Sequence, residues 1–133
     1  MKTLVIDSHA LLAYFEKQAG WDKVAQVLHD AAGGSYRLVM SVVNWGEIYY
    51  ITLREYGENH VDRVMRALDN MPLEILDADR AMTVQAARFK ARGGLSYADS
   101  FVCGLAKLIK GAEILTGDPE FRSVEKEIQV RWL

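Results

Sequence analysis

Short continuous apolar runs alternate along the chain with longer stretches in which apolar residues recur every three or four positions. The first run, Leu4 to Ile6, contains no polar residue and is typical of a strand covered on both faces. Further strands are expected at residues 37–40, 73–76, 114–115 and 129–132. Helical spacing predicts helices at residues 9–16, 21–32, 42–56, 60–70, 79–91 and 96–110. This alternation predicts an α/β sandwich around a mainly parallel sheet.

Composition places the chain among compact globular proteins. It has 133 residues, of which 50% are hydrophobic and 26% charged, and it contains no repeat or linker-like segment, so we expect one domain over residues 1–133. The formal net charge of −2 at pH 7 excludes a broadly basic protein that grips nucleic acid with its whole surface. The net charge does not exclude local basic patches that bind nucleic acid.

The single cysteine and the lack of long apolar segments narrow the cellular setting. Because Cys103 has no partner in the chain, no intrachain disulfide and no CxxC zinc site can form, and Cys103 is expected to be a packing residue. The sequence shows no signal peptide, and no apolar stretch approaches the roughly 18 residues that a membrane span needs. These features predict a cytoplasmic protein that does not cross a membrane.

Four acidic residues follow predicted strands or open predicted helices. Asp7 directly follows the first strand, and Asp118 follows the strand at residues 114–115. Glu47 lies early in the helix after the second strand, and Asp99 lies in the first turn of a later helix. Loops at the carboxyl ends of the strands in an open α/β sheet converge on one crevice. We therefore expect the functional site at this edge of the sheet.

Three of these acids also have a purely structural interpretation. Asp7 can cap the helix that follows it, and Asp118 followed by Pro119 is typical of an N-cap with proline at the first helical position. Ser96 and Asp99 have the spacing of a capping box. Taken singly, these acids are better explained as caps than as catalytic residues.

Glu47 is harder to explain by structure alone. On a helical wheel it lies at the edge of a broad apolar arc formed by Val42, Val43, Trp45, Tyr49, Tyr50, Leu53 and Tyr56. A carboxylate there is partly desolvated, which is costly without a partner. Either Arg54, two turns later on the same side, or a metal ion can be that partner. Asp99 similarly flanks an apolar arc formed by Tyr97, Ala98, Phe101, Val102, Leu105, Leu108 and Ile109.

Carboxylates gathered at one edge would dominate the local electrostatics. Two like charges about 5 Å apart repel by roughly 3 kcal/mol at an effective dielectric of 20, so such a cluster takes up protons or recruits cations. Oxygen ligands without a His or Cys pattern select hard cations, Mg²⁺ or Mn²⁺. Once loaded with metal, the cluster would bind phosphate and activate water for in-line attack.

The four acids lie in four short segments, which are VIDS at residues 5–8, SVVNWGE at 41–47, LSYADS at 95–100 and LTGDPEF at 115–121. These segments resemble the acidic motifs of PIN-domain ribonucleases, and the length and motif order are most similar to VapC-type toxins of prokaryotic toxin–antitoxin pairs. The resemblance implies a three-layer α/β/α fold with a central parallel sheet, Mg²⁺- or Mn²⁺-dependent endoribonuclease activity on RNA, a homodimer and a cognate antitoxin. It alone brings Asp99 into the site, because the Asp99 helix follows another helix.

The resemblance assigns metal binding and catalysis to four carboxylates, namely Asp7, Glu47, Asp99 and Asp118. It matches Ser8 and Thr116 to hydroxyl residues that support these carboxylates, with ordinary turn or cap hydrogen bonding as the structural alternative. Asn44, one turn before Glu47, can orient a carboxylate or a water. Glu120 is either an additional ligand or a solvated helix start.

Because the net charge is negative, the RNA backbone must be held locally. Four cations near the Asp99 segment are candidates, with solvated surface as their structural alternative: Arg88, Lys90, Arg92 and Lys107. His9, which follows Ser8, can contact a phosphate or simply be exposed at the start of a helix.

Three other functions also use acidic residues or aromatic clusters of this kind. A haloacid-dehalogenase-like phosphatase needs a second aspartate two residues after the first, where this chain has His9. A receiver-like signalling domain expects a pair of acids at the first strand, and only Asp7 is present there. A non-catalytic partner-binding module would use the acids as caps and an aromatic cluster as its interface: Trp45, Tyr49, Tyr50 and Tyr56.

Overall fold

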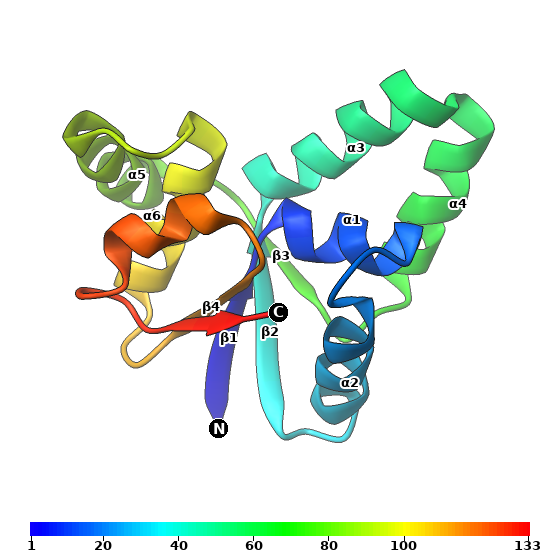
Figure 1. The fold of residues 1–133 in the computed structure, drawn as a ribbon, viewed down its shortest axis with the longest axis horizontal. Helices are drawn as coiled ribbons and strands as arrows, with labels where there is room; N and C mark the ends of the chain where they lie inside the picture. The colour runs from blue at the N-terminus through cyan, green and yellow to red at the C-terminus, as the bar shows by residue number, and fades with distance from the viewer.

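The computed structural model describes residues 1–133 and contains a five-stranded sheet with helices on both faces (Figure 1). The strands are β1 (Lys2–Ile6), β2 (Tyr36–Ser41), β3 (Glu74–Leu76), β4 (Glu113–Thr116) and β5 (Val130–Trp132). Their order is β3-β2-β1-β4-β5, and every neighbouring pair is parallel. The expected three-layer α/β/α fold with a central parallel sheet is confirmed.

Six α-helices and one short 3₁₀ helix connect the strands. They are α1 (Ser8–Glu16), α2 (Trp21–Ala32), α3 (Val42–Tyr56), α4 (Glu58–Asp69), α5 (Arg80–Arg92), α6 (Tyr97–Leu108) and η1 (Pro119–Val124). The helices expected at residues 21–32 and 42–56 have the observed bounds, and the other four differ by at most two residues at an end. None of the helices combines the length and apolar character that a membrane span requires.

The central strands feed two separate cores, because successive side chains of a strand point to opposite faces of the sheet. Leu4, Ile6 and Leu115 pack under α1, α2, α3 and α4. Val5 and Ile114 pack on the opposite face, under α5, α6 and η1. Figure 1 shows these two groups of helices on opposite sides of the sheet. The continuous apolar run in β1 is therefore explained by burial on both faces.

Helix α6 is buried almost all round, because it lies between the sheet and α5. Residues 99–106 are all buried, and Gly104 lets the two helices approach closely. A Cβ on Gly104 would lie only 2.7 Å from the main-chain nitrogen of Ala86. The arc predicted for this helix is wrong at its ends, since Tyr97 and Leu108 are 52% and 47% exposed. This packing fixes the position of α6, which carries Asp99.

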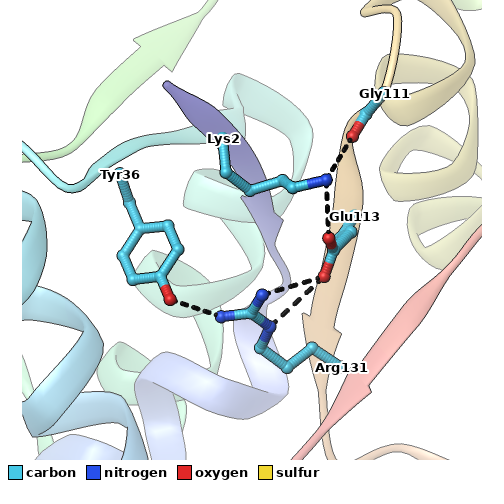
Figure 2. A network of polar contacts seen from close by, with 5 residues as sticks. All are labelled: Lys2, Tyr36, Gly111, Glu113 and Arg131. Carbon is cyan, nitrogen blue, oxygen red and sulfur yellow. Dashed lines mark hydrogen bonds and ion pairs between the residues drawn. The ribbon is translucent and has the colours of Figure 1, made fainter.

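At the amino ends of the strands, the buried carboxylate of Glu113 lies between two cations (Figure 2). Lys2 Nζ lies 2.9 Å from Glu113 Oε2, and Arg131 lies 3.1 Å from Glu113 Oε1. Lys2 also donates to the carbonyl of Gly111, and Arg131 donates to the hydroxyl of Tyr36. Burial by itself would raise the pKa of Glu113, but the hydrogen bond from Lys2 and the charge of Arg131 outweigh it and lower that pKa. This end of the sheet is therefore neutralised by the chain itself.

Candidate active site

Asp7 is fully buried at the carboxyl end of β1. Its Oδ1 accepts the main-chain N–H of Ala10 at 2.8 Å, so it caps α1, and its Oδ2 accepts the hydroxyl of Thr116 at 2.5 Å. Burial raises the pKa of Asp7 to about 7; these hydrogen bonds reduce the rise, and the charges of Asp118 and Glu47 add to it. Asp7 is thus both a cap and a member of a cluster of acids.

Asp99, Asp118 and Glu120 form a compact group whose ligand oxygens all lie within 4.8 Å of one another. Asp99 is in the first turn of α6, and its N–H is donated to Ser96 Oγ at 3.1 Å. Burial raises the pKa of Asp99 to about 9, and the shared hydrogen bond with Glu120 and the negative charges of Asp118 and Asp7 raise it further. Asp99 therefore retains its proton at neutral pH when no cation is present.

The predicted caps are confirmed, and they help to form the cluster. Asp118 caps η1 by accepting the N–H of Glu120 at 2.9 Å through Oδ1, as Asp7 caps α1 through one of its oxygens. Each cap bond fixes the rotation of a carboxylate group. The structural and chemical interpretations of Asp7 and Asp118 are therefore compatible, because one residue performs both tasks.

Glu47 is held by two polar side chains and not by a cation. Ser8 Oγ donates to Glu47 Oε1 at 2.8 Å, and Asn44 Nδ2 donates to the same oxygen at 3.2 Å. Both bonds go to Oε1, which leaves Oε2 available to a ligand. The alternative pairing with Arg54 is wrong, because Arg54 lies 3.6 Å from the carboxylate of its neighbour Glu55.

The buried stripe of α3 also differs from the predicted apolar arc. Asn44, Ile48 and Thr52 are its buried residues, whereas Tyr50 and Tyr56 are 51% and 53% exposed. A helical wheel assigns the apolar side of a helix to the interior. The interior that α3 faces, however, includes polar groups at the carboxyl edge of the sheet. Two polar residues therefore occupy the buried stripe, and part of the aromatic cluster faces solvent.

No cation of the chain neutralises the acidic cluster, which we define as five residues: Asp7, Glu47, Asp99, Asp118 and Glu120. None of the ion pairs in the structure involves these carboxylates. The cluster consequently differs from an ordinary salt-bridge network. Its charge is reduced only by retained protons, as the raised pKa values of Asp7 and Asp99 indicate.

Two further residues lie beside the cluster without joining it. Cys103 packs in the apolar core, as expected, and burial together with the charge of Asp99 raises its pKa to about 12, so its thiol stays protonated. His9 is exposed, and a Cβ on Gly117 would lie 2.9 Å from the His9 ring. The His9 ring therefore packs against Gly117, the residue that precedes Asp118.

Most of the cations predicted to hold RNA already have partners. Arg92 and Lys107 both pair with Glu127, at 2.5 and 3.1 Å. Lys90 donates to a main-chain carbonyl at 2.9 Å. Arg88 is exposed on α5 and forms no ion pair, so it is the candidate whose charge is most available.

Three solved structures with the same fold are similar over most of this chain. The VapBC complex bound to DNA from Salmonella typhimurium is 17% identical, with a TM-score of 0.74 and 98% of each chain covered. VapBC2 from Rickettsia felis, bound to a DNA fragment from its promoter, is 13% identical, with a TM-score of 0.75 and 98% of each chain covered. Mycobacterium tuberculosis VapC20, a toxin that cleaves the sarcin–ricin loop, is 12% identical, with a TM-score of 0.70 and 91% of this chain and 94% of that chain covered.

A comparison of sequences gives the family. No curated protein matches the chain. A family model described as the PIN domain matches residues 4–127, which include all four predicted motifs with their acids. The chain belongs to the PIN domain family.

Proposed function

We propose that this protein is a divalent-metal-dependent endoribonuclease that hydrolyses RNA phosphodiester bonds, as the toxin of a VapC-type toxin–antitoxin pair. One observation carries the proposal: five carboxylates converge at the carboxyl edge of the sheet with no cation of the chain to neutralise them. Membership of the PIN domain family supports it over the phosphatase and receiver alternatives. VapC20, which shares the fold, cleaves RNA in the sarcin–ricin loop, and this supports RNA as the substrate class.

The donor set of the acidic cluster fits Mg²⁺ or Mn²⁺. All its candidate ligands are carboxylate oxygens, which hard divalent cations prefer. Asp99, Asp118 and Glu120 would hold one cation, because their oxygens already lie within 4.8 Å of one another. Asp7 and Glu47 would complete this site or hold a second ion. When bound, such a cation polarises a phosphoryl oxygen and lowers the pKa of a water molecule.

The chain's own contribution is to orient the carboxylates before the substrate arrives. Thr116 holds one oxygen of Asp7, and Ser8 holds one oxygen of Glu47, so neither carboxylate rotates freely. Asp99 must release its retained proton when a cation binds, since a protonated carboxyl is a poor ligand. Metal affinity is therefore expected to rise with pH across the neutral range.

We propose that Arg88, Lys90, Arg92 and Lys107 form the basic side of the RNA path. The formal net charge of −2 leaves no large positive surface, so a few local contacts must hold the phosphates. Of these cations Arg88 has no ion-pair partner to give up. Unpaired RNA loops suit such local contacts better than duplex does, because their bases and backbone can be splayed out.

We also propose a cognate antitoxin, a homodimer and a cytoplasmic location. The VapBC structures that share the fold support an antitoxin partner. Exposed aromatic residues on the α1–α4 side give a surface for protein contacts: Trp21 on α2, and Tyr50 and Tyr56 on α3. Aromatic residues are enriched in protein interfaces, so a partner on this side accounts for their exposure.

The decisive experiment is incubation of the purified protein with tRNA and ribosomal RNA, with and without Mn²⁺, beside Asp7→Ala. A discrete cut that needs both the metal and Asp7 is expected. Asp79→Ala is the matched control, because Asp79 caps α5 through the N–H of Met82 at 2.9 Å but is no part of the acidic cluster. Equal cleavage by Asp7→Ala, or without metal, would contradict the proposal.

A further inference from the structure

Asn44 is a fully buried amide that bridges two of the elements that carry cluster acids. It lies in the first turn of α3, one turn before Glu47. Its Nδ2 donates to Glu47 Oε1 at 3.2 Å and to the main-chain carbonyl of Ala98 at 3.1 Å. Ala98 directly precedes Asp99 in α6. The Asn44 side chain therefore links the carboxylate of Glu47 to the segment that carries Asp99, although 54 positions separate Asn44 from Ala98 in sequence.

The orientation of this amide is fixed by its neighbours. Both groups that it contacts are acceptors, so the nitrogen must face them, and a flipped amide would set oxygen against oxygen. The carbonyl oxygen Oδ1 of Asn44 is then left buried without any partner, and it is the only buried side-chain polar atom of the protein in this state. Leaving such an acceptor unsatisfied is unfavourable, because folding removes its hydrogen bond to water without replacing it.

A purely structural link between α3 and α6 does not explain this oxygen. The link uses only the two N–H groups of Asn44, and a buried acceptor without a donor is rare in native proteins. A polar site beside carboxylates is where a buried water finds the two to four partners it needs. A water bonded to Oδ1 would have the Glu47 carboxylate close by as a second acceptor.

We infer that Asn44 is a positioning residue: its Nδ2 holds Glu47 and the start of α6 in register for metal binding, and its Oδ1 accepts a hydrogen bond from a water molecule of the site. This inference rests on the proposed metal-dependent function. It assigns Asn44 no contact with the RNA. It explains why an asparagine occupies the buried stripe of α3, where an apolar residue would satisfy packing alone.

The first test is calorimetric titration of Mn²⁺ into the metal-free protein and two variants. Asn44→Ala is expected to weaken Mn²⁺ binding by roughly 10–100-fold, the usual loss when a group that orients a ligand is removed. Thr52→Ala is the matched control, because Thr52 is a second buried polar residue on the same stripe of α3 and is not one of the hydrogen-bond donors to Glu47. Its Mn²⁺ affinity should stay within about twofold of the parent.

A second variant keeps the test valid if Asn44→Ala folds poorly. Asn44→Leu keeps the branched skeleton of four side-chain heavy atoms and removes both the donors and the orphaned oxygen, so it should be more stable than Asn44→Ala yet show the same loss of Mn²⁺ affinity. A merely structural role predicts instead that affinity follows stability. Affinity equal to the parent in a folded Asn44 variant would overturn the inference while leaving the proposed function intact.

A crystal structure of the Mn²⁺-loaded parent protein tests the second half of the inference. Electron density for a water within 3.5 Å of Asn44 Oδ1 is expected, and its absence would overturn the assignment of that oxygen. Failure of the parent protein to bind Mn²⁺ at all would refute the metal-dependent function and this inference together. The two failures are therefore distinguishable.

Discussion

The two ends of the sheet hold buried carboxylates in opposite electrostatic states. At the amino ends, Glu113 is buried between Lys2 and Arg131, and its pKa lies below the usual value. At the carboxyl ends, Asp7 lies deeper in the protein and has no cation, and its pKa is raised to about 7. Neither carboxylate is accessible to solvent, but only Glu113 has a compensating charge. A buried acid in this fold is structural where the chain supplies its counterion and chemically open where the chain does not.

The uncompensated end lowers stability unless something else neutralises it. Like charges within about 5 Å repel, and protonation or a bound cation relieves that repulsion. The contrast between the ends therefore makes measurable predictions, since each perturbation should affect one end and spare the other.

The largest effect is expected for Asp99→Asn. Cleavage of RNA should fall by about 10³-fold or more, equivalent to roughly 4 kcal/mol in the barrier, because a metal ligand and its charge are lost. The metal-free variant should nevertheless be more stable than the parent in urea, since Asp99 must take up a proton to be buried beside Asp118, whereas an amide is neutral without one. A variant that still cleaves would remove Asp99 from the mechanism.

The second effect is stabilisation by metal. Mn²⁺ at 100 times its Kd should stabilise the fold by about 2.7 kcal/mol and raise Tm by roughly 10 °C. Glu113→Gln should keep this rise, because Glu113 lies at the other end of the sheet, whereas Asp99→Asn should lose most of it. Thermal melts of the three proteins, with and without Mn²⁺, make the comparison, and a non-catalytic interaction module would show no shift in any of them.

The third effect is the dependence of stability on pH. Because the pKa values of Asp7 and Asp99 are raised from 3.8 to about 7 and about 9, the folded state holds these protons more tightly than the unfolded chain. The free energy of unfolding of metal-free protein should therefore fall as pH rises from about 4 to about 9, and it should be clearly lower at pH 8 than at pH 5. Urea unfolding at the two pH values measures it. Saturating Mn²⁺ should flatten the slope, and greater metal-free stability at pH 8 would contradict the argument.

The neutralised end provides the fourth prediction. Glu113→Gln should destabilise the protein by about 1–2 kcal/mol, less than for a fully buried pair, because Lys2 and Arg131 are 43% and 35% exposed and can be hydrated. Cleavage per folded molecule should be unchanged. Glu74→Gln is the control, since its pair with Arg37 at 2.9 Å is exposed and should contribute under about 1 kcal/mol.

The smallest effect concerns the basic residues near the acidic end. Arg88→Ala should weaken RNA binding a few-fold and reduce the salt slope by about one, as expected for one phosphate contact. Arg92→Ala should change binding less, because the charge of Arg92 is already paired with Glu127. Filter binding at two salt concentrations, in an Asp99→Asn background that prevents cleavage, compares them. Equal losses would show that the Glu127 pair opens when RNA binds.

Local pattern predicted the fold well because each element is specified by its own residues. The run at residues 4–6 is apolar on both faces of the sheet, and the spacing at residues 42–56 gave the observed bounds of α3. Caps were predictable for the same reason, since Asp7 and Ser96 contact groups three residues away.

Contacts between distant segments could not be predicted in this way. The helical wheel offers Arg54 as a partner for Glu47, whereas one of its two actual donors, Ser8, is 39 residues away in sequence. The position of Asp99 depends on Gly104 packing against α5 and on the bond between Asn44 and Ala98. Only the resemblance to PIN-domain ribonucleases brought Asp99 into the site. The sequence alone does not decide the role of Glu120, because an exposed helix start has the same local pattern with or without acidic neighbours in space.

Four of the five acids of the cluster are caps or first-turn residues of α1, α6 and η1, and the fifth, Glu47, lies in the second turn of α3. Aligned peptide dipoles give the start of an α-helix about half a positive charge. The backbone of α1, α3 and α6 thus supplies a fixed positive field that no change of pH can titrate. This field lowers the cost of placing several carboxylates close together. It would also attract an incoming phosphate once bound cations neutralise the carboxylates. This edge of the sheet is therefore suited to hold both the cations and the phosphate that hydrolysis of a phosphodiester requires.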